Sequence, residues 1–417
     1  MAVYFENSAG EYEVYKSQKP SVDIMLGFND SSEQYGLIAQ SANRNIAMDL
    51  NHPQTIIATG NQGSGKSYTS GSILEMSLQR ILGINHLPNK MATVVFHYSN
   101  TQSYRPEART MTQPNDQAEQ IKLLAEKYHA KPEALEEVVY LVPPDKLAER
   151  QIEYKGSTVL PIQFKADDLK TQHWKLLMGA EGNKAAYLRI INNLMREHRE
   201  NLSIDLLREG FIKACPDEKL IEFGLMRLDF AEQYVSPESQ ITNFLQPGRL
   251  VIVDLRDELI EKDEALTLFM ILMDLFSEAQ HNGGQFNKLV MFDECHKYIQ
   301  NRFLVNALTE AVREMRHRGT SIILASQDPQ SIPATLLELA SMMFLFKFNS
   351  PLWLAHLQKA NTALRNLTPE KLNALKPGEA YVWANKSSDI SFTRQAHKIQ
   401  CRPRVTKHGG DSVTAVR

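Results

Sequence analysis

Short apolar runs bounded by turn residues recur along the chain, and this pattern predicts buried β-strands. They occupy residues 55–59, 93–99, 250–256, 288–294, 320–326, 343–348 and 379–384. Between several of these runs lie segments with apolar residues at three-to-four spacing, which indicates helices packed on a sheet. The clearest are 67–81, 261–280 and 302–318. This alternation predicts an α/β fold with a mainly parallel sheet.

The pattern changes between residues 101 and 247, where charge is dense and helical patches dominate. Two short extended pieces, 138–144 and 158–164, interrupt them. We therefore expect a mostly helical insertion within the sheet-forming core. The expected parts of the chain are a short N-terminal β region at 1–50, the core at 51–100 and 248–400, the insertion at 101–247, and a C-terminal arm or tail at 401–417. Because its first part is extended and polar, we expect the arm to lie across a neighbouring subunit.

The composition is that of a globular protein, with 43% hydrophobic and 23% charged residues among 417. The formal net charge is −3 and the pI is near 6.5, so the overall balance does not indicate nucleic-acid binding, although a local basic surface is compatible with it. The three cysteines show no paired spacing, which predicts neither a metal site nor a redox couple. Without a signal-peptide pattern or a membrane-spanning run, we expect a cytoplasmic protein that makes no membrane contact.

Residues 60–67, GNQGSGKS, fit the phosphate-binding pattern GxxxxGK[ST]. The glycines let successive backbone N–H groups point at phosphate oxygens, Lys66 neutralises the β and γ phosphates of ATP, and the Ser67 hydroxyl completes the shell of a Mg²⁺ ion. A chance match is the alternative, but the position between a predicted strand and a predicted helix argues against it. The predicted nucleotide-binding residues are Gly60, Asn61, Gln62, Gly63, Ser64, Gly65, Lys66, Ser67 and Tyr68.

A later apolar run ends in Asp293 and Glu294. In a parallel sheet this places both carboxylates at the carboxyl edge, beside the phosphate loop. We expect Asp293 to hold Mg²⁺ through water and Glu294 to polarise the attacking water, which indicates hydrolysis rather than transfer to a second substrate. The alternative is a strand that simply ends in solvated acids. His296, two positions further on, is interpreted as local structure rather than as a catalytic group.

The next predicted strand ends in Gln327. An amide at this position can contact both the γ phosphate and the attacking water, so we expect it to sense hydrolysis. The alternative is a simple turn residue before Asp328 and Pro329.

The helix predicted at 302–318 has a polar face rich in arginine. That face is either solvated surface or the source of an arginine finger that enters a neighbouring subunit's site, where such residues accelerate hydrolysis by about 10³ to 10⁵. Arg318 is the first choice for the finger because it precedes the glycine expected to end the helix. Arg316 and Arg313 follow.

Taken together, these motifs resemble the HerA/FtsK superfamily of P-loop ATPases, on its HerA-like branch. The match runs in order from about residue 37 to 410 through GNQGSGKS, LVIVDLR, LVMFDECHKYI, AVREMRHRGTSIILASQDPQSIP, PGEAYVWA and CRPRVTKHGG. The resemblance implies a RecA-like core and a hexameric ring with ATP sites between subunits, moving along double-stranded DNA. Carried onto this chain, it implies a nucleotide site at Gly60, Gly63, Gly65, Lys66 and Ser67, a Walker B pair at Asp293 and Glu294, a sensor at Gln327 and a trans arginine at Arg318.

Three departures from the family pattern are visible. FtsK-type and conjugative relatives have membrane helices or a DNA-reading terminal domain, and the sequence shows the pattern of neither, which argues against roles in chromosome segregation and conjugation. The acidic residue that family members usually carry after the second strand is replaced here by His97 or Tyr98. The N-terminal β-barrel of HerA proteins is longer than the segment that precedes this phosphate loop, so we expect the barrel to be reduced or absent.

The sequence leaves two functions open. The first is a ring-forming ATP hydrolase of the DNA translocase or helicase type, working with a separately encoded nuclease or other effector in DNA end processing or antiviral defence. The second is an ATP-dependent oligomeric scaffold that assembles or gates a partner enzyme without DNA translocation. Salt-sensitive DNA binding separates them, since phosphate contacts weaken with ionic strength. Basic residues that flank or lie in the insertion, and could contact DNA, are Arg105, Arg109, Lys165 and Lys170.

Overall fold

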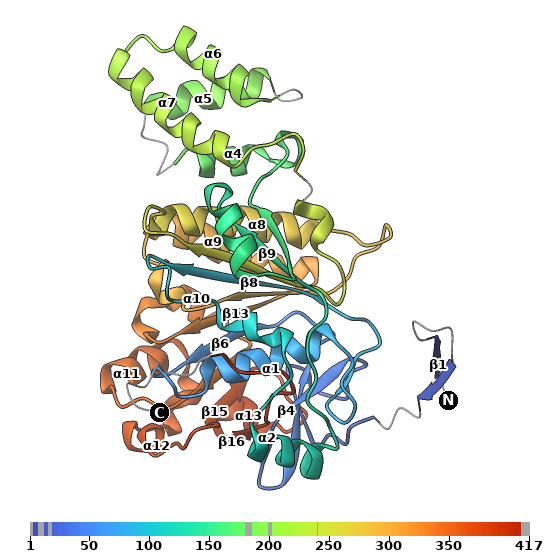
Figure 1. Cartoon of the computed structure of the whole chain (residues 1–417). Coiled ribbons are helices and arrows are strands. Elements are labelled where there is room, and N and C mark those ends of the chain that lie inside the picture. Colours follow the sequence, from blue (N-terminus) through green and yellow to red (C-terminus); the bar gives the residue numbers. More distant parts are fainter. Residues whose placement is uncertain are drawn as a thin grey trace.

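A computed structural model describes residues 3–6, 12–15, 19–179, 186–198, 202–239 and 241–409. One large sheet forms the centre of the molecule, and helices cover both of its faces (Figure 1). A group of helices, α4 to α7, projects beyond one edge of this body at the top of the view. A separate two-stranded ribbon is formed by β1 (Val3–Glu6) and β2 (Tyr12–Tyr15).

One part of the sheet is parallel throughout. Its strands lie in the spatial order β10 (Thr158–Pro161), β9 (Val138–Val142), β11 (Leu250–Arg256), β8 (Ala92–Ser99), β12 (Lys288–Phe292), β13 (Thr320–Ser326), β6 (Thr55–Thr59) and β14 (Met342–Leu345). The predicted α/β class with a mainly parallel sheet is therefore confirmed. Because β6 lies between β13 and β14, the segment that follows it emerges at the middle of the carboxyl edge.

A second part of the sheet continues beyond β14 with mostly antiparallel pairing. It contains, in order, β15 (Glu379–Ala384), β16 (His397–Cys401), β4 (Tyr35–Ser41), β5 (Arg44–Asp49) and β3 (Ile24–Leu26), while β7 (Asn85–His86) pairs with β4. Strands β3, β4 and β5 of the N-terminal β region are thus joined to the central sheet through the C-terminal strand β16, whereas β1 and β2 form the separate ribbon.

The core lies on both faces of the parallel strands, which explains why they read as continuous apolar runs. Alternate residues of β8 point to opposite faces: Val94 and Phe96 belong to one apolar cluster, whereas Val95 belongs to the other. Helices α8 (Lys262–Glu278) and α9 (Arg302–Met315) pack on the first face. Helix α1 (Lys66–Leu78) packs on the second.

The region expected to be a helical insertion also contributes to the sheet, because β9 and β10 both fall within 101–247. Its projecting part consists of α4 (Thr171–Leu177), α5 (Ala186–Glu197), α6 (Ile204–Ala214) and α7 (Glu218–Gln233). Shorter helices complete the fold: α2 (Ala118–Leu123), α3 (Leu147–Glu153), α10 (Ala334–Leu337), α11 (Pro351–Ala360), α12 (Pro369–Asn373) and α13 (Ser391–Arg394).

Candidate functional site

The loop between β6 and α1 has the backbone of a phosphate cradle. Gly63 and Gly65 adopt φ values of 70° and 110°, which side chains other than glycine rarely allow. At Gly60 a Cβ atom would lie 2.7 Å from the Cβ of Phe346, so the loop packs too closely there for any other residue. Helix α1 begins directly after Gly65 with neither a side-chain cap nor an acidic residue in its first turn. Its N–H groups and dipole are therefore free to receive an anion.

The side chain of Lys66 lies inside this loop. Its ammonium donates to the carbonyl oxygen of Asn61 at 2.9 Å, and the residue is 4% exposed. Burial lowers the pKa of Lys66, and the nearby carboxylates of Glu294 and Asp293 oppose that shift. The cation is thus held among groups of opposite charge, where it can bind a phosphate without further desolvation.

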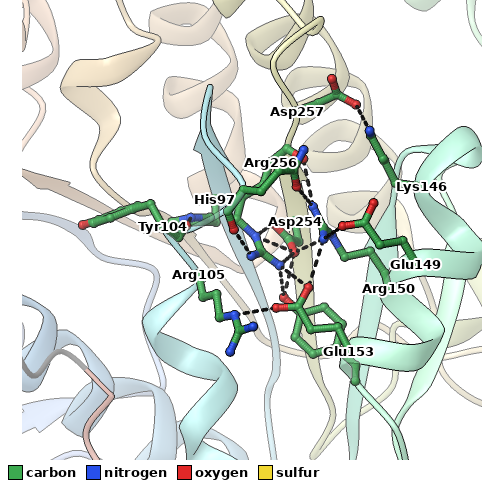
Figure 2. A network of polar contacts seen from close by, with 12 residues as sticks. His97, Tyr104, Arg105, Lys146, Glu149, Arg150, Glu153, Asp254, Arg256 and Asp257 are labelled. Atoms are coloured by element: carbon green, nitrogen blue, oxygen red, sulfur yellow. Dashed lines mark hydrogen bonds and ion pairs between the residues drawn. The ribbon is translucent and has the colours of Figure 1, made fainter. Parts of the chain in front are cut away.

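Asp293 follows the last residue of β12 and meets the neighbouring strand β8. One carboxylate oxygen of Asp293, Oδ2, lies 3.3 Å from Nδ1 of His97. His97 Nε2 donates to the carbonyl oxygen of Tyr104 at 2.8 Å (Figure 2). Tyr98 points to the other face and donates to the carbonyl of Ile260. Of the two residues that could replace the family's acid, His97 is therefore the one at the site.

Glu294 is held in an unusual backbone conformation, with φ 48° and ψ 44°. This left-handed region costs a residue other than glycine about 1–3 kcal/mol, and it aims the carboxylate back into the site. Gln327 Nε2 donates to Glu294 Oε1 at 2.6 Å. Oε2 is buried 3.3 Å from Nδ1 of His296 and makes no hydrogen bond in the described structure. Burial and the charge of Asp293 raise the pKa of Glu294, and the Gln327 hydrogen bond and the charge of Lys66 lower it. Such an oxygen can accept a proton from water.

These groups share one cavity of about 1110 Å³. Among the predicted residues it is lined by Gln62, Gly63, Gly65, Lys66, Ser67, Tyr68, Asp293, Glu294 and Gln327. The remaining three predicted residues shape the loop instead: Gly60 packs on Phe346, Asn61 donates to the carbonyl of Lys347 at 2.9 Å, and Ser64 Oγ donates to the carbonyl of Asn61 at 2.6 Å.

The oxygen ligands at this cavity fit a Mg²⁺ ion. The Ser67 hydroxyl and the Asp293 carboxylate both face the cavity, and Mg²⁺ favours one or two such ligands completed by phosphate oxygens and water. The described residues contain no group of three or more His, Cys, Asp or Glu side chains that could hold a metal by themselves. The site therefore suits a metal that arrives with the nucleotide.

Further lining residues were not assigned to the nucleotide from the sequence. They come from the loop after β8, from α2 and from the C-terminal segment, and include Gln102, Tyr104, Arg105, Arg109, Gln120, Leu123, Gln400 and His408. From the sequence, Arg105 and Arg109 are either DNA contacts or solvated surface, and the structure places both on this cavity. No local signal separates those two uses of an arginine, because only the tertiary structure brings the loop to the cavity.

The C-terminal segment packs on its own chain. Arg402 forms a fully buried ion pair with Glu75 of α1 at 2.6 Å, and Arg404 pairs with Glu107 at 2.6 Å. Glu75 on α1 is a buried carboxylate, and Arg402 supplies the positive charge without which burying it would be strongly destabilising. That the arm lies across a neighbouring subunit stays a prediction. Residues 410–417 lie outside the described part of the chain.

The arginines of the predicted finger lie elsewhere. Arg318 is separated from β13 by Gly319 alone, and it lies at the amino edge of the sheet, opposite the edge that carries Lys66. It forms ion pairs with Asp274 and, at 3.2 and 3.1 Å, with Glu278 and Glu314 of the same chain. Arg313 is exposed, and the side chain of Arg316 lies outside the described residues. A finger acts in a neighbouring subunit, so this assignment stays a prediction.

Comparison with known proteins gives matches of structure alone: no family model and no curated protein matches the chain. VirB4 of Thermoanaerobacter pseudethanolicus is similar with a TM-score of 0.55 and 10% identity, over 91% of this chain and 98% of that chain. The bacterial conjugative coupling protein TrwB is similar with a TM-score of 0.54 and 11% identity, over 92% of each chain. TrwB in complex with a non-hydrolysable ATP analogue is similar with a TM-score of 0.53, at 11% identity and over 92% of each chain.

No helix in the described ranges is both long and apolar enough to cross a membrane. The chain has the RecA-like P-loop fold of VirB4 and TrwB, which agrees with the resemblance of its motifs to the HerA/FtsK superfamily.

Proposed function

We propose that the protein is an Mg²⁺-dependent ATP hydrolase. The observation that carries this proposal is the convergence of four side chains, from segments that follow β6, β12 and β13, on one cavity: Lys66, Asp293, Glu294 and Gln327. In this assignment Lys66 and the loop amides bind the phosphates, Ser67 and Asp293 hold the metal, and Glu294 takes the proton of the attacking water. The buried Oε2 of Glu294 supports that role, because it lies beside His296 Nδ1 but makes no hydrogen bond among the described residues, and a bound water would satisfy it.

We further propose that hydrolysis drives movement along double-stranded DNA by a homo-oligomeric ring, with six subunits as the expected number. The shared fold with TrwB, described as a plasmid coupling protein, supports this proposal. In this proposal the ring works with a separately encoded nuclease or other effector, in DNA end processing or antiviral defence. The net charge of −3 favours the second candidate, an ATP-dependent scaffold without DNA translocation.

The deciding experiment measures steady-state ATPase rates with and without linear double-stranded DNA, using Glu294→Gln as the blank and Lys66→Ala as the variant that should not bind nucleotide. Strong stimulation by DNA that disappears in both variants supports the translocase. Slow hydrolysis that DNA leaves unchanged supports the scaffold. The absence of Lys66-dependent hydrolysis contradicts both.

DNA affinity measured at several salt concentrations gives an independent test. If the ring contacts the phosphate backbone, the logarithm of the association constant falls linearly with the logarithm of salt concentration, with a slope of about −0.9 per phosphate contacted. Binding that does not depend on salt would exclude a backbone-tracking motor.

A further inference from the structure

The loop after β8 connects the nucleotide cavity to a buried ionic network (Figure 2). On the cavity side, Tyr104 stacks on His97 with ring centroids 5.5 Å apart and accepts its hydrogen bond, and His97 contacts Asp293. On the network side, the carbonyl of Gln102 accepts from Nη1 of Arg256 at 2.6 Å. The loop is therefore linked through His97 to Asp293, the proposed metal ligand, and through Gln102 to Arg256 at the end of β11.

The network balances its buried charges without help from the loop. Glu153 Oε2 accepts from Arg150 at 3.0 Å and from Arg256 at 2.9 Å. Asp254 accepts from Arg256 at 2.7 Å and from the hydroxyl of Tyr154 at 2.7 Å. The side chains of Arg150, Arg256 and Asp254 are at most 2% exposed, so these pairs are fixed parts of the fold.

Arg105 is an additional cation at the rim of this network. Its Nε lies 2.7 Å from Glu153 Oε1; the side chain of Arg105 is 51% exposed and that of Glu153 15%, so the pair is open to solvent on the arginine side only. Arg150 and Arg256 both contact Oε2 of Glu153, so the carboxylate stays paired when Arg105 leaves, while the buried Oε1, which makes no hydrogen bond among the described residues, becomes free for water. Arg105 also lines the same cavity as Lys66 and Glu294.

Building on the proposed ATP hydrolysis, we propose that Arg105 is a second phosphate-binding cation, supplied by the same chain, which exchanges Glu153 for the terminal phosphate of a bound nucleoside triphosphate. A guanidinium suits this exchange because it binds carboxylate and phosphate oxygens with the same fork of donors. Tyr104 is held by His97, which in turn contacts Asp293. Arg105 follows Tyr104 in the chain, so its side chain has only to rotate toward the phosphates. The exchange would couple binding of the γ phosphate to α3, the helix that contains Arg150 and Glu153.

The test measures the dissociation constants of a fluorescent non-hydrolysable ATP analogue and of fluorescent ADP for Arg105→Ala. The matched control is Arg44→Ala, because Arg44 is 49% exposed and also pairs with a single carboxylate, that of Asp389 at 2.9 Å, but is not a lining residue of the cavity. We expect R105A to weaken the ATP analogue about tenfold or more and ADP by less than about twofold. R44A should change neither.

A second readout follows the network itself. Amide hydrogen exchange of α3 should change when the wild-type protein binds the ATP analogue, and this change should be lost in R105A. If R105A binds both nucleotides like R44A, or loses both equally, the exchange at Arg105 is wrong while the proposed hydrolase stands. If the wild type shows no binding that depends on Lys66, the proposed function fails first.

Discussion

Glu294 carries the central chemical step proposed for this site, and its surroundings set its proton affinity. Burial and the neighbouring Asp293 raise the pKa of Glu294 above its usual 4.5, whereas the hydrogen bond from Gln327 and the charge of Lys66 lower it. The carboxylate is thus a stronger base than a solvated glutamate. The same repulsion destabilises the folded protein whenever both carboxylates are ionised.

Glu294→Gln should separate activity from stability. We expect hydrolysis to fall by at least about 100-fold, the usual contribution of a general base, while nucleotide binding persists. The variant should be more stable than the wild type by roughly 1 kcal/mol at neutral pH, because a buried charge beside Asp293 is removed. ATPase assays and thermal unfolding measure the two effects.

The pH dependence of that stability has a defined sign. Because the pKa of Glu294 is raised on folding, the folded state binds more protons than the unfolded state. The stabilisation that Glu294 contributes to the free energy of unfolding is therefore complete below pH 4.5, and it is lost as the pH rises through the higher pKa of the folded state. The stability advantage of E294Q should therefore grow with pH across that window. An advantage that shrinks as pH rises would contradict the raised pKa.

Gln327→Ala should shift the pH profile of hydrolysis. The substitution removes the hydrogen bond that favours the ionised form of Glu294, so the pKa of Glu294 should rise further. Since the base acts only when ionised, the acidic limb of the ATPase rate should move to higher pH. An unchanged limb with a lower maximal rate would show that Gln327 acts on the nucleotide or water alone.

At the scale of elements, the C-terminal segment 401–409 and α1 form one unit behind the phosphate loop. Glu75 of α1 accepts from Arg402, from the backbone of Val405 and from both the backbone and hydroxyl of Thr406. Contacts with residues 401–409 therefore fix the position of helix α1, which begins with Lys66.

Arg402→Ala should destabilise the protein by about 3–5 kcal/mol, because it leaves Glu75 as an uncompensated buried charge. Unfolding in denaturant measures this loss. Arg394→Ala, at an exposed position at the end of α13, is the control and should change stability by less than about 0.5 kcal/mol. Equal effects of the two substitutions would argue against the buried pair.

At the scale of the whole molecule, a cluster around Asp274 joins the projecting helices to the core. The carboxylate of Asp274 accepts from His173 at 2.8 Å and Lys170 at 3.2 Å, both from the helical region, and it also pairs with Arg318 beside β13. These partners hold the pKa of Asp274 far below its usual range. Arg318 thus has a role within its own chain that competes with the predicted finger.

Arg318→Ala distinguishes these roles. From the contacts within the chain, we expect lower thermal stability and an ATPase rate per folded subunit within about twofold of the wild type. Loss of about 10³-fold or more in rate, without loss of stability, would instead support a finger acting in a neighbouring subunit. Mixing R318A with E294Q subunits and measuring recovered activity would then locate the finger in trans.

Features that depend on neighbouring residues could be predicted from local sequence patterns. Apolar runs indicated strands because parallel strands are buried on both faces, and they located β6, β8, β11, β12 and β13 closely. The glycine spacing around Lys66 indicated the phosphate loop because its backbone conformation is a local requirement. Asp293 and Glu294 were found because they end an apolar strand.

Contacts between distant segments could not be predicted in this way and became visible in the folded chain. The contacts of His97 with Asp293 and of Arg105 with Glu153, the burial of Arg402 against Glu75, and the entry of β9 and β10 into the central sheet all join residues or strands far apart in sequence. Neither a helical nor a strand period encodes such pairings. They follow from the way the whole chain buries its apolar faces and neutralises the charges left inside.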